Sequence, residues 1–93
     1  MEIIAIEIKM YAPWVQSLKE KRMIVKSIIS RISNKFCVSV AEIDTQDLHK
    51  TITIGIAAVS QNRAYADSLS AAIEHFIESN TDAEILNYNV EFR

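Results

Sequence analysis

Glycine, proline and cysteine are almost absent from this 93-residue sequence, since each occurs only once. Average usage predicts roughly six glycines and five prolines in a chain of this length. The scarcity of glycine excludes the glycine-rich loops that cradle phosphates, and the scarcity of proline excludes proline-rich linkers. A lone cysteine excludes an internal disulfide and a cysteine-rich zinc site, so we expect a reducing compartment.

Long hydrophobic runs are missing as well. The first apolar stretch, residues 3–6, is followed by Glu7 and Lys9, which excludes the core of a signal peptide. No run approaches the ~18 apolar residues that a membrane span requires. We therefore expect a cytoplasmic protein with no membrane partner. With 49% hydrophobic and 24% charged residues, the composition is that of one globular domain over residues 1–93.

Acidic residues are scarce in one segment of the sequence, residues 19–35. The net charge is −2, which indicates no general affinity for nucleic acid. Between residues 19 and 35, however, the only acid is Glu20, and it stands among six bases: Lys19, Lys21, Arg22, Lys26, Arg31 and Lys35. From residue 36 onward acids outnumber bases. The sequence thus places a basic segment in an otherwise acidic protein.

Hydrophobic periodicity predicts six elements. Alternation of apolar and polar residues predicts strands over 2–10, 36–43, 51–60 and 85–92. Apolar stripes of helical spacing predict one helix over 18–34, opened by a capping box of Ser17 and Glu20, and a second over 62–78. The order β-α-β-β-α-β predicts an α+β fold, the ferredoxin-like sandwich, in which two helices cover one face of a four-stranded antiparallel sheet.

The predicted sheet has two different faces. The face under the helices is apolar and includes Leu86 in the last strand, and the stripe of the second helix includes Tyr65 and Ala72. The open face is small or polar, which is typical of a solvated surface but also allows two sheets to approach. The residues that we assign to self-association are Ala5, Ser39, Ala41, Thr53, Gly55 and Ala57. Base stacking on this face is not expected, because strands 2–10 and 51–60 contain no aromatic residue.

The first helix carries the candidate nucleic-acid contacts. Lys19, Arg22 and Lys26 lie within about 60° of one another on a helical wheel, pointing away from the apolar stripe. Such a face is typically solvated, and it can also bind a phosphate backbone. Lys21 falls within the apolar stripe, so we expect its stem to pack and its ammonium to reach solvent, unless it is a functional lysine. Lys21 and Arg31 complete the set of five candidate nucleic-acid contacts.

Several segments together resemble a known family. Residues 17–22 (SLKEKR), 25–27 (VKS), 38–42 (VSVAE), 46–48 (QDL) and 55–57 (GIA) are similar to those of the YlxP-like family of small bacterial domains of unknown function. The resemblance spans nearly the whole chain and implies a ferredoxin-like fold with no assigned activity. Members are often encoded near ribosome-maturation and translation-initiation factors, which implies an association with RNA or the ribosome.

Enzymatic chemistry finds little support in the sequence. Asp44, Asp47 and His49 are a conceivable metal site, but such residues are ordinary in a surface connector. The Val15-Gln16 pair follows the first strand, where acylphosphatases bind phosphate, but it lacks their flanking glycines. We expect no catalytic residue, metal, cofactor or small-molecule substrate. The favoured hypothesis is a non-enzymatic protein that binds RNA or the ribosome, and the alternative is a protein-interaction module or homodimer that uses the open sheet face.

Overall fold

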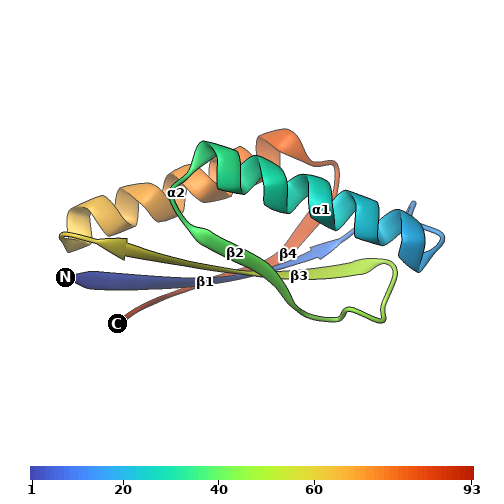
Figure 1. Ribbon diagram of the computed structural model, residues 1–93, viewed down its shortest axis with the longest axis horizontal. Coiled ribbons are helices and arrows are strands. Elements are labelled where there is room, and N and C mark those ends of the chain that lie inside the picture. The colour runs from blue at the N-terminus through green and yellow to red at the C-terminus, as the bar shows by residue number, and fades with distance from the viewer.

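The computed structural model describes residues 1–93 and contains the six elements in the predicted order (Figure 1). The strands are β1 (Glu2–Tyr11), β2 (Ser39–Asp44), β3 (Thr51–Ser60) and β4 (Glu84–Phe92), and the helices are α1 (Leu18–Lys35) and α2 (Arg63–Asn80). The strands form one antiparallel sheet in the order β2-β3-β1-β4, with both helices on the same face. The α+β, ferredoxin-like arrangement is therefore confirmed.

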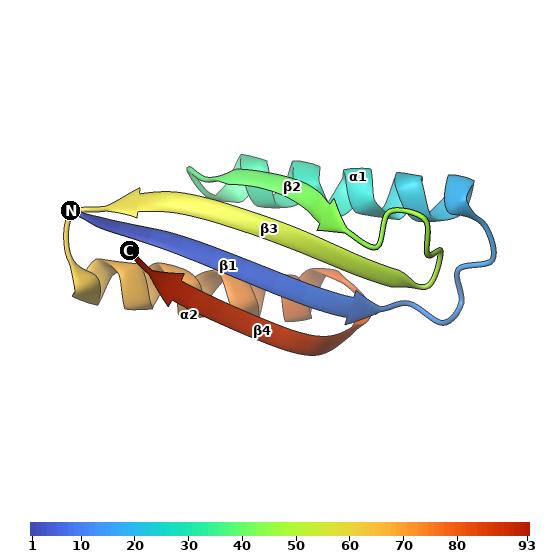
Figure 2. The ribbon, with the colours of Figure 1, turned by 90° about the horizontal axis from the view of Figure 1, so that it is seen from below.

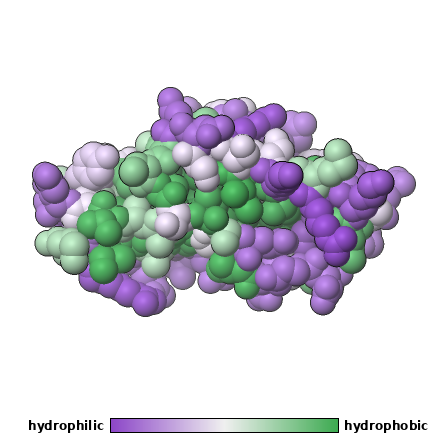
Figure 3. Space-filling view, viewed as in Figure 1, coloured by the Kyte–Doolittle hydropathy of each residue, from purple (hydrophilic) through white to green (hydrophobic).

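The core lies between the sheet and the helices. β1 and β3 are the central strands and pair along their whole length, from Glu2 opposite Ser60 to Tyr11 opposite Thr51. Their alternating isoleucines point toward the helices and are fully buried, because a period of two places every second side chain on one face. Figure 3 shows hydrophobic side chains as a band between the sheet and the helices above it.

α1 begins where the capping box predicts. The Glu20 amide donates to Ser17 Oγ at 3.1 Å, although the Glu20 side chain does not return the bond. Val25, Ile28 and Ile32 are buried, which confirms the predicted stripe. The Phe36 amide closes the helix by donating to the Ile32 carbonyl at 2.9 Å. Because Phe36 serves as the C-cap, β2 starts three residues later than predicted, at Ser39.

α2 is capped by Asn62, whose Oδ1 accepts from the Tyr65 amide at 2.8 Å. Ile73 and Ile77 are buried as predicted, but the placement of Tyr65 and Ala72 in the buried stripe is wrong, because both are exposed. The small side chains of Ala66 and Ser70 are buried in this helix. Small side chains let a helix approach a sheet closely, so part of the buried side of α2 is formed by residues that are not the most hydrophobic ones.

β4 differs from the prediction at a bulge. Lys9 of β1 pairs with Asn87, whereas the next residue, Met10, pairs with Ile85, so Leu86 is the extra residue. Ile85 packs against the core, and Leu86 is 51% exposed. The expected placement of Leu86 on the apolar face is therefore wrong, because simple alternation ignores the one-residue shift that a bulge introduces.

The other face of the sheet has no helix over it (Figure 2). In that view α1 lies behind β2 and β3, and α2 lies behind β1 and β4. β1 extends one residue further than predicted, to Tyr11, so its last position does carry an aromatic residue. Neither helix is long and apolar enough to cross a membrane.

Candidate nucleic-acid interface

Lys19, Arg22 and Lys26 are exposed on the outer side of α1 and form what we call the basic face. They occupy the first half of an 18-residue helix whose opposite side, with Val25 and Ile28, is buried against the sheet. The predicted outward orientation of these three cations is thus confirmed. Their binding role stays a prediction.

No carboxylate neutralises the basic face. The three ion pairs of the molecule involve other cations: Lys21, Arg63 and Arg93. The single acid in the first turn of α1, Glu20, uses its backbone amide for the cap and forms no ion pair. The charges of the basic face are therefore available to an external anion.

The basic face stands at the end of the helix where cations are least favourable. The helix dipole places partial positive charge at the N-terminus, where acidic residues are normally stabilising. α1 nevertheless has Lys19 at its second position and Arg22 one turn from its start. Cations at the start of a helix go against the preference set by the helix dipole, and here no carboxylate within the chain compensates them. Such departures from local preference are more typical of binding sites than of a purely structural surface.

Lys21 is buried, with 1% of its surface exposed, so the expectation that its ammonium reaches solvent is wrong. Its Nζ lies 3.0 Å from Glu42 Oε2 and donates to the carbonyls of Thr45 at 2.5 Å and of Leu48 at 2.6 Å. A buried ammonium needs such partners, and here three oxygens supply them. Lys21 therefore joins α1 to β2 and to the β2–β3 loop, and is not part of the basic face.

The β2–β3 loop is held in an unusual conformation at the point that Lys21 contacts. Thr45 has a φ of 56°, in the left-handed region that β-branched residues rarely adopt. Its amide donates to Asp44 Oδ1 at 2.8 Å, and its hydroxyl lies 2.9 Å from that of Thr53. These bonds and the Lys21 ammonium fix the loop, which explains how a strained residue is tolerated.

Arg31, the last of the predicted cations, lies apart from the basic face. It is exposed and donates from Nη1 to the carbonyl of Asn80 at 3.0 Å, linking α1 to the end of α2. It also lines a groove of about 520 Å³ between α1 and the α2–β4 connection. The structure thus divides the five predicted residues into the three of the basic face, a buried Lys21 and a groove-lining Arg31.

The same groove is lined by two exposed hydrophobic side chains that sequence reasoning did not assign to a site. Trp14, in the β1–α1 connector, is 43% exposed, and Met23 of α1 is 67% exposed. A signal for Trp14 was present in the sequence, since it is the only tryptophan and follows the only proline in a connector. An exposed aromatic beside cations is a composition that nucleic-acid sites use.

The backbone of the β1–α1 connector differs from the glycine-flanked loop with which acylphosphatases bind phosphate. The Val15 amide donates to the Ala12 carbonyl at 3.2 Å, and the Val15 side chain is fully buried. The molecule has a single residue with a positive φ, Thr45, and it lies in the β2–β3 loop. Nowhere do three or more His, Cys, Asp or Glu side chains gather in a way that could hold a metal ion. Cys37 is a free, exposed thiol.

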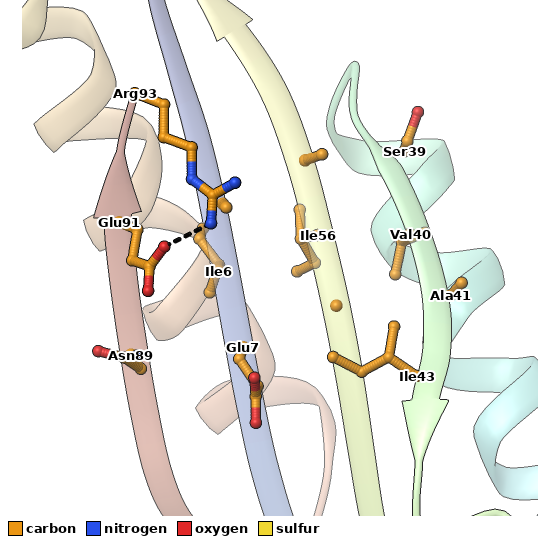
Figure 4. A pocket seen from close by; sticks show the side chains of 13 residues that line it. Ile6, Glu7, Ser39, Val40, Ala41, Ile43, Ile56, Asn89, Glu91 and Arg93 are labelled. Atoms are coloured by element: carbon orange, nitrogen blue, oxygen red, sulfur yellow. Dashed lines mark hydrogen bonds and ion pairs between the residues drawn. The ribbon is translucent and has the colours of Figure 1, made fainter.

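The open sheet face contains a hollow of about 460 Å³ (Figure 4). Of the six residues assigned to self-association, Ser39, Ala41 and Ala57 are exposed and Ala5 is half-buried around this hollow. Thr53, in contrast, is only 2% exposed, because Thr45 and its loop fold against it. Its expected availability to a partner is therefore wrong.

The side chain of Ile43 requires a glycine at position 55. A bulge in β2 makes Ile43 the extra residue between Glu42 and Asp44, and its side chain reaches over β3 (Figure 4). A Cβ at Gly55 would lie 2.7 Å from Ile43 Cγ2, closer than carbon atoms can approach. Gly55 thus allows Ile43 to lie flat on the sheet, and this contact explains the glycine without a partner.

The fold and the surface just described define a small α+β domain whose first helix carries three exposed cations without an ion-pair partner. The chain belongs to the family described as a protein of unknown function (DUF503), whose model matches residues 3–90. It is similar to the uncharacterized protein YlxP of Bacillus subtilis (strain 168), with 43% identity over 68 residues, which cover 73% of this chain and 74% of the relative. The expected resemblance is confirmed.

Proposed function

We propose that this protein is a non-enzymatic RNA-binding protein of the cytoplasm, whose basic face binds the phosphate backbone of structured RNA or of a ribosomal subunit. The observation that carries the proposal is the exposure of Lys19, Arg22 and Lys26 on one side of α1 without an ion-pair partner. A protein whose net charge is −2 gains little from non-specific attraction, so its affinity for RNA depends on this local concentration of cations.

Neutral groups on α1 support the same function. Ser30 and Ser33 are exposed and lie on the same side of the helix as Lys26, at the spacing of one turn. Hydroxyl groups commonly bind phosphate oxygens beside lysine and arginine. α1 thus offers three cations followed by two hydroxyls along one line, which suits a polyanion better than an acidic side chain on a protein.

The test is RNA binding as a function of salt. With three phosphate contacts, the affinity for RNA should fall between roughly 50 and 200 mM salt by about 20-fold if the contacted phosphates are single-stranded, and by about 40-fold if they belong to a duplex. The variant with Lys19→Glu, Arg22→Glu and Lys26→Glu should lose binding at the higher salt and show almost no salt dependence. Filter binding or fluorescence anisotropy with a ribosomal RNA fragment measures both quantities.

A matched control separates the basic face from net charge. Lys9 in β1 and Lys35 at the end of α1 are exposed and unpaired, like Lys19 and Lys26. The double variants Lys9→Glu/Lys35→Glu and Lys19→Glu/Lys26→Glu change the net charge equally, and only the second should weaken binding by tenfold or more. Equal losses in the two variants, or unchanged affinity in the triple variant, would contradict the proposal.

A second candidate function is self-association through the open sheet face. It is favoured by the small exposed side chains of Ser39, Ala41 and Ala57 around the hollow, since such residues let two sheets pack closely. Ile3 and Val59, paired across β1 and β3 at one end of this face, are also exposed. Light scattering should then give a dimer that Ala57→Arg dissociates, and a monomer at high concentration would count against it.

A further inference from the structure

Trp14 is held by a fixed backbone, although its ring is half exposed. Its neighbours Ala12 and Val15 are fully buried. The Ala12 amide donates to the Lys50 carbonyl at 2.7 Å, and Lys50 Nζ donates to the Pro13 carbonyl at 2.5 Å. A tryptophan on an anchored connector loses little conformational freedom when a flat ligand stacks on it, because the backbone is already ordered.

The groove beside Trp14 has one apolar wall and one polar rim. Met23, Ile24 and Ile28 of α1 line the apolar side. The opposite rim consists of the consecutive residues Ser79, Asn80, Thr81 and Asp82. Arg31 bridges the two sides through its bond to the Asn80 carbonyl and has further N–H donors. The volume of the groove, about 520 Å³, is within the range of small-ligand sites.

One row of side chains connects the groove with the basic face. Lys19, Met23, Ser27 and Arg31 follow one another at intervals of four residues on α1, so they form a continuous ridge along the helix. Met23, Ser27 and Arg31 line the groove, while Lys19 belongs to the basic face. A ligand that contacts the basic face with one part therefore reaches the groove with another.

Charge determines which part of such a ligand enters the groove. The basic face attracts phosphates, whereas Asp82 on the far rim of the groove repels them and accepts hydrogen bonds from N–H groups. Uncharged, flat rings with polar edges suit the space between Trp14 and this rim. Nucleobases have these properties, and only the bases of unpaired RNA are free to leave the helical stack.

We propose that the groove between α1 and the α2–β4 connection holds an unpaired nucleobase stacked on Trp14, while the basic face binds the adjoining phosphates of the same single strand. This inference rests on the proposed function and adds the ligand class: single-stranded RNA, or a loop, in preference to a duplex. Trp14 and Met23 supply stacking surface, and Arg31 and the polar rim contact the edge of the base.

The test uses Trp14 as its own reporter, because it is the only tryptophan of the chain. An oligouridylate of about twelve nucleotides should quench Trp14 emission in a saturable manner. Heparin, a polyanion without bases, should bind the basic face and leave the emission unchanged. Trp14→Ala should weaken oligouridylate binding about 5- to 150-fold and leave heparin affinity as it was, since stacking contributes only to the base-bearing ligand.

Two further variants complete the design. Trp14→Phe should retain most of the affinity because it keeps an aromatic face. Tyr65→Ala removes an exposed aromatic of α2 that does not line the groove, and it should change nothing. The Lys19, Arg22 and Lys26 triple variant should lose both ligands, which links this test to the proposed function.

The failures of the two proposals are distinguishable. If oligouridylate binds through the basic face, but does not quench Trp14 emission and binds the Trp14→Ala variant as tightly as the wild type, the base site is overturned while RNA binding stands. Equal quenching by heparin also overturns it. If the emission shifts with protein concentration and not with RNA, the groove is a protein contact. If neither ligand binds at low salt, both proposals fail.

Discussion

The two helices have equal length and cover the same sheet face, yet their outer sides carry opposite charge. Besides the buried Lys21, α1 has five exposed bases and one acid, whereas α2 has one base, Arg63, and three acids, Asp67, Glu74 and Glu78. Each helix buries four residues. The packing of the domain therefore depends on the buried residues of each helix and places no constraint on the charge of the exposed residues. Because the fold does not require the exposed cations of α1, their clustering on this helix favours a role in binding.

The helices also differ in how polar groups fasten them to the sheet. α1 uses a buried cation, Lys21, which contacts Glu42 and two carbonyls of the β2–β3 loop. α2 uses neutral groups, since the Tyr88 hydroxyl of β4 donates to the Ser70 carbonyl at 2.7 Å. A charged group costs more to desolvate, so losing its partners is more damaging than losing a neutral bond.

The largest effect should come from removing the cation that fastens α1. Lys21→Met leaves the Glu42 carboxylate and two loop carbonyls without their partner, so we expect the free energy of unfolding to fall by about 3 kcal/mol or more. Lys26→Met, the same substitution on the basic face, should change it by less than about 0.5 kcal/mol. Urea unfolding followed by circular dichroism measures both.

A double variant sharpens the interpretation of Lys21. Lys21→Met combined with Glu42→Leu removes both charges and should recover part of the lost stability, because no carboxylate is left unpaired. Recovery remains partial, since the carbonyls of Thr45 and Leu48 still lack a donor. If Lys21→Met and Lys26→Met were equally mild, the role assigned to Lys21 would be wrong.

The neutral link of α2 should be weaker and sensitive to high pH. Tyr88→Phe should cost about 1 kcal/mol, because one hydrogen bond to the Ser70 carbonyl is lost. Burial raises the pKa of Tyr88 above its usual 10.0, the Ser70 hydroxyl opposes the rise and the Glu74 carboxylate adds to it. Stability should therefore be complete below pH 10 and fall as the pH rises through the raised pKa. Urea midpoints on both sides of pH 10, compared with those of Tyr88→Phe, test the sign.

The smallest effect should separate stability from binding on α1 itself. Lys19→Glu replaces a cation by an acid at the positive end of the helix dipole, so it should stabilise the fold by about 0.3–1 kcal/mol while weakening RNA binding. Lys35→Glu, in the last turn, should destabilise by a similar amount and leave binding unchanged. Urea unfolding at low salt measures the change in stability, and fluorescence anisotropy measures the change in RNA affinity. A Lys19→Glu protein that is less stable than the wild type would remove the argument that this cation is unfavourable for the fold.

Most of the fold could be predicted because the elements have clear periods. Alternating isoleucines identified β1 and β3, and Ser17 marked the start of α1. Leu86 was misplaced, and the second bulge, at Ile43, was not foreseen, because a bulge depends on the register with the neighbouring strand. Tyr65 was misplaced since the close packing of Ala66 and Ser70 is decided by the sheet beneath them.

The candidate site was predictable only on its exposed side. The outward direction of Lys19, Arg22 and Lys26 follows from helix geometry, which is local. The fate of Lys21 is not local, since its partners Glu42, Thr45 and Leu48 lie more than 20 residues away. The groove beside Trp14 likewise needs the C-terminal end of α2 to form its second wall.

The order of the elements, the apolar side of each central strand and the charge of α1 can be derived from the amino-acid pattern alone, because they depend on spacings of a few residues. Which cations are free depends on how the whole chain folds. The tertiary structure surrounded the buried Lys21 ammonium with three oxygens, left the basic face unpaired and placed Trp14 and Asp82 in the lining of one groove. These outcomes depend on contacts between distant segments, and no local pattern specifies which distant groups the folded chain brings together.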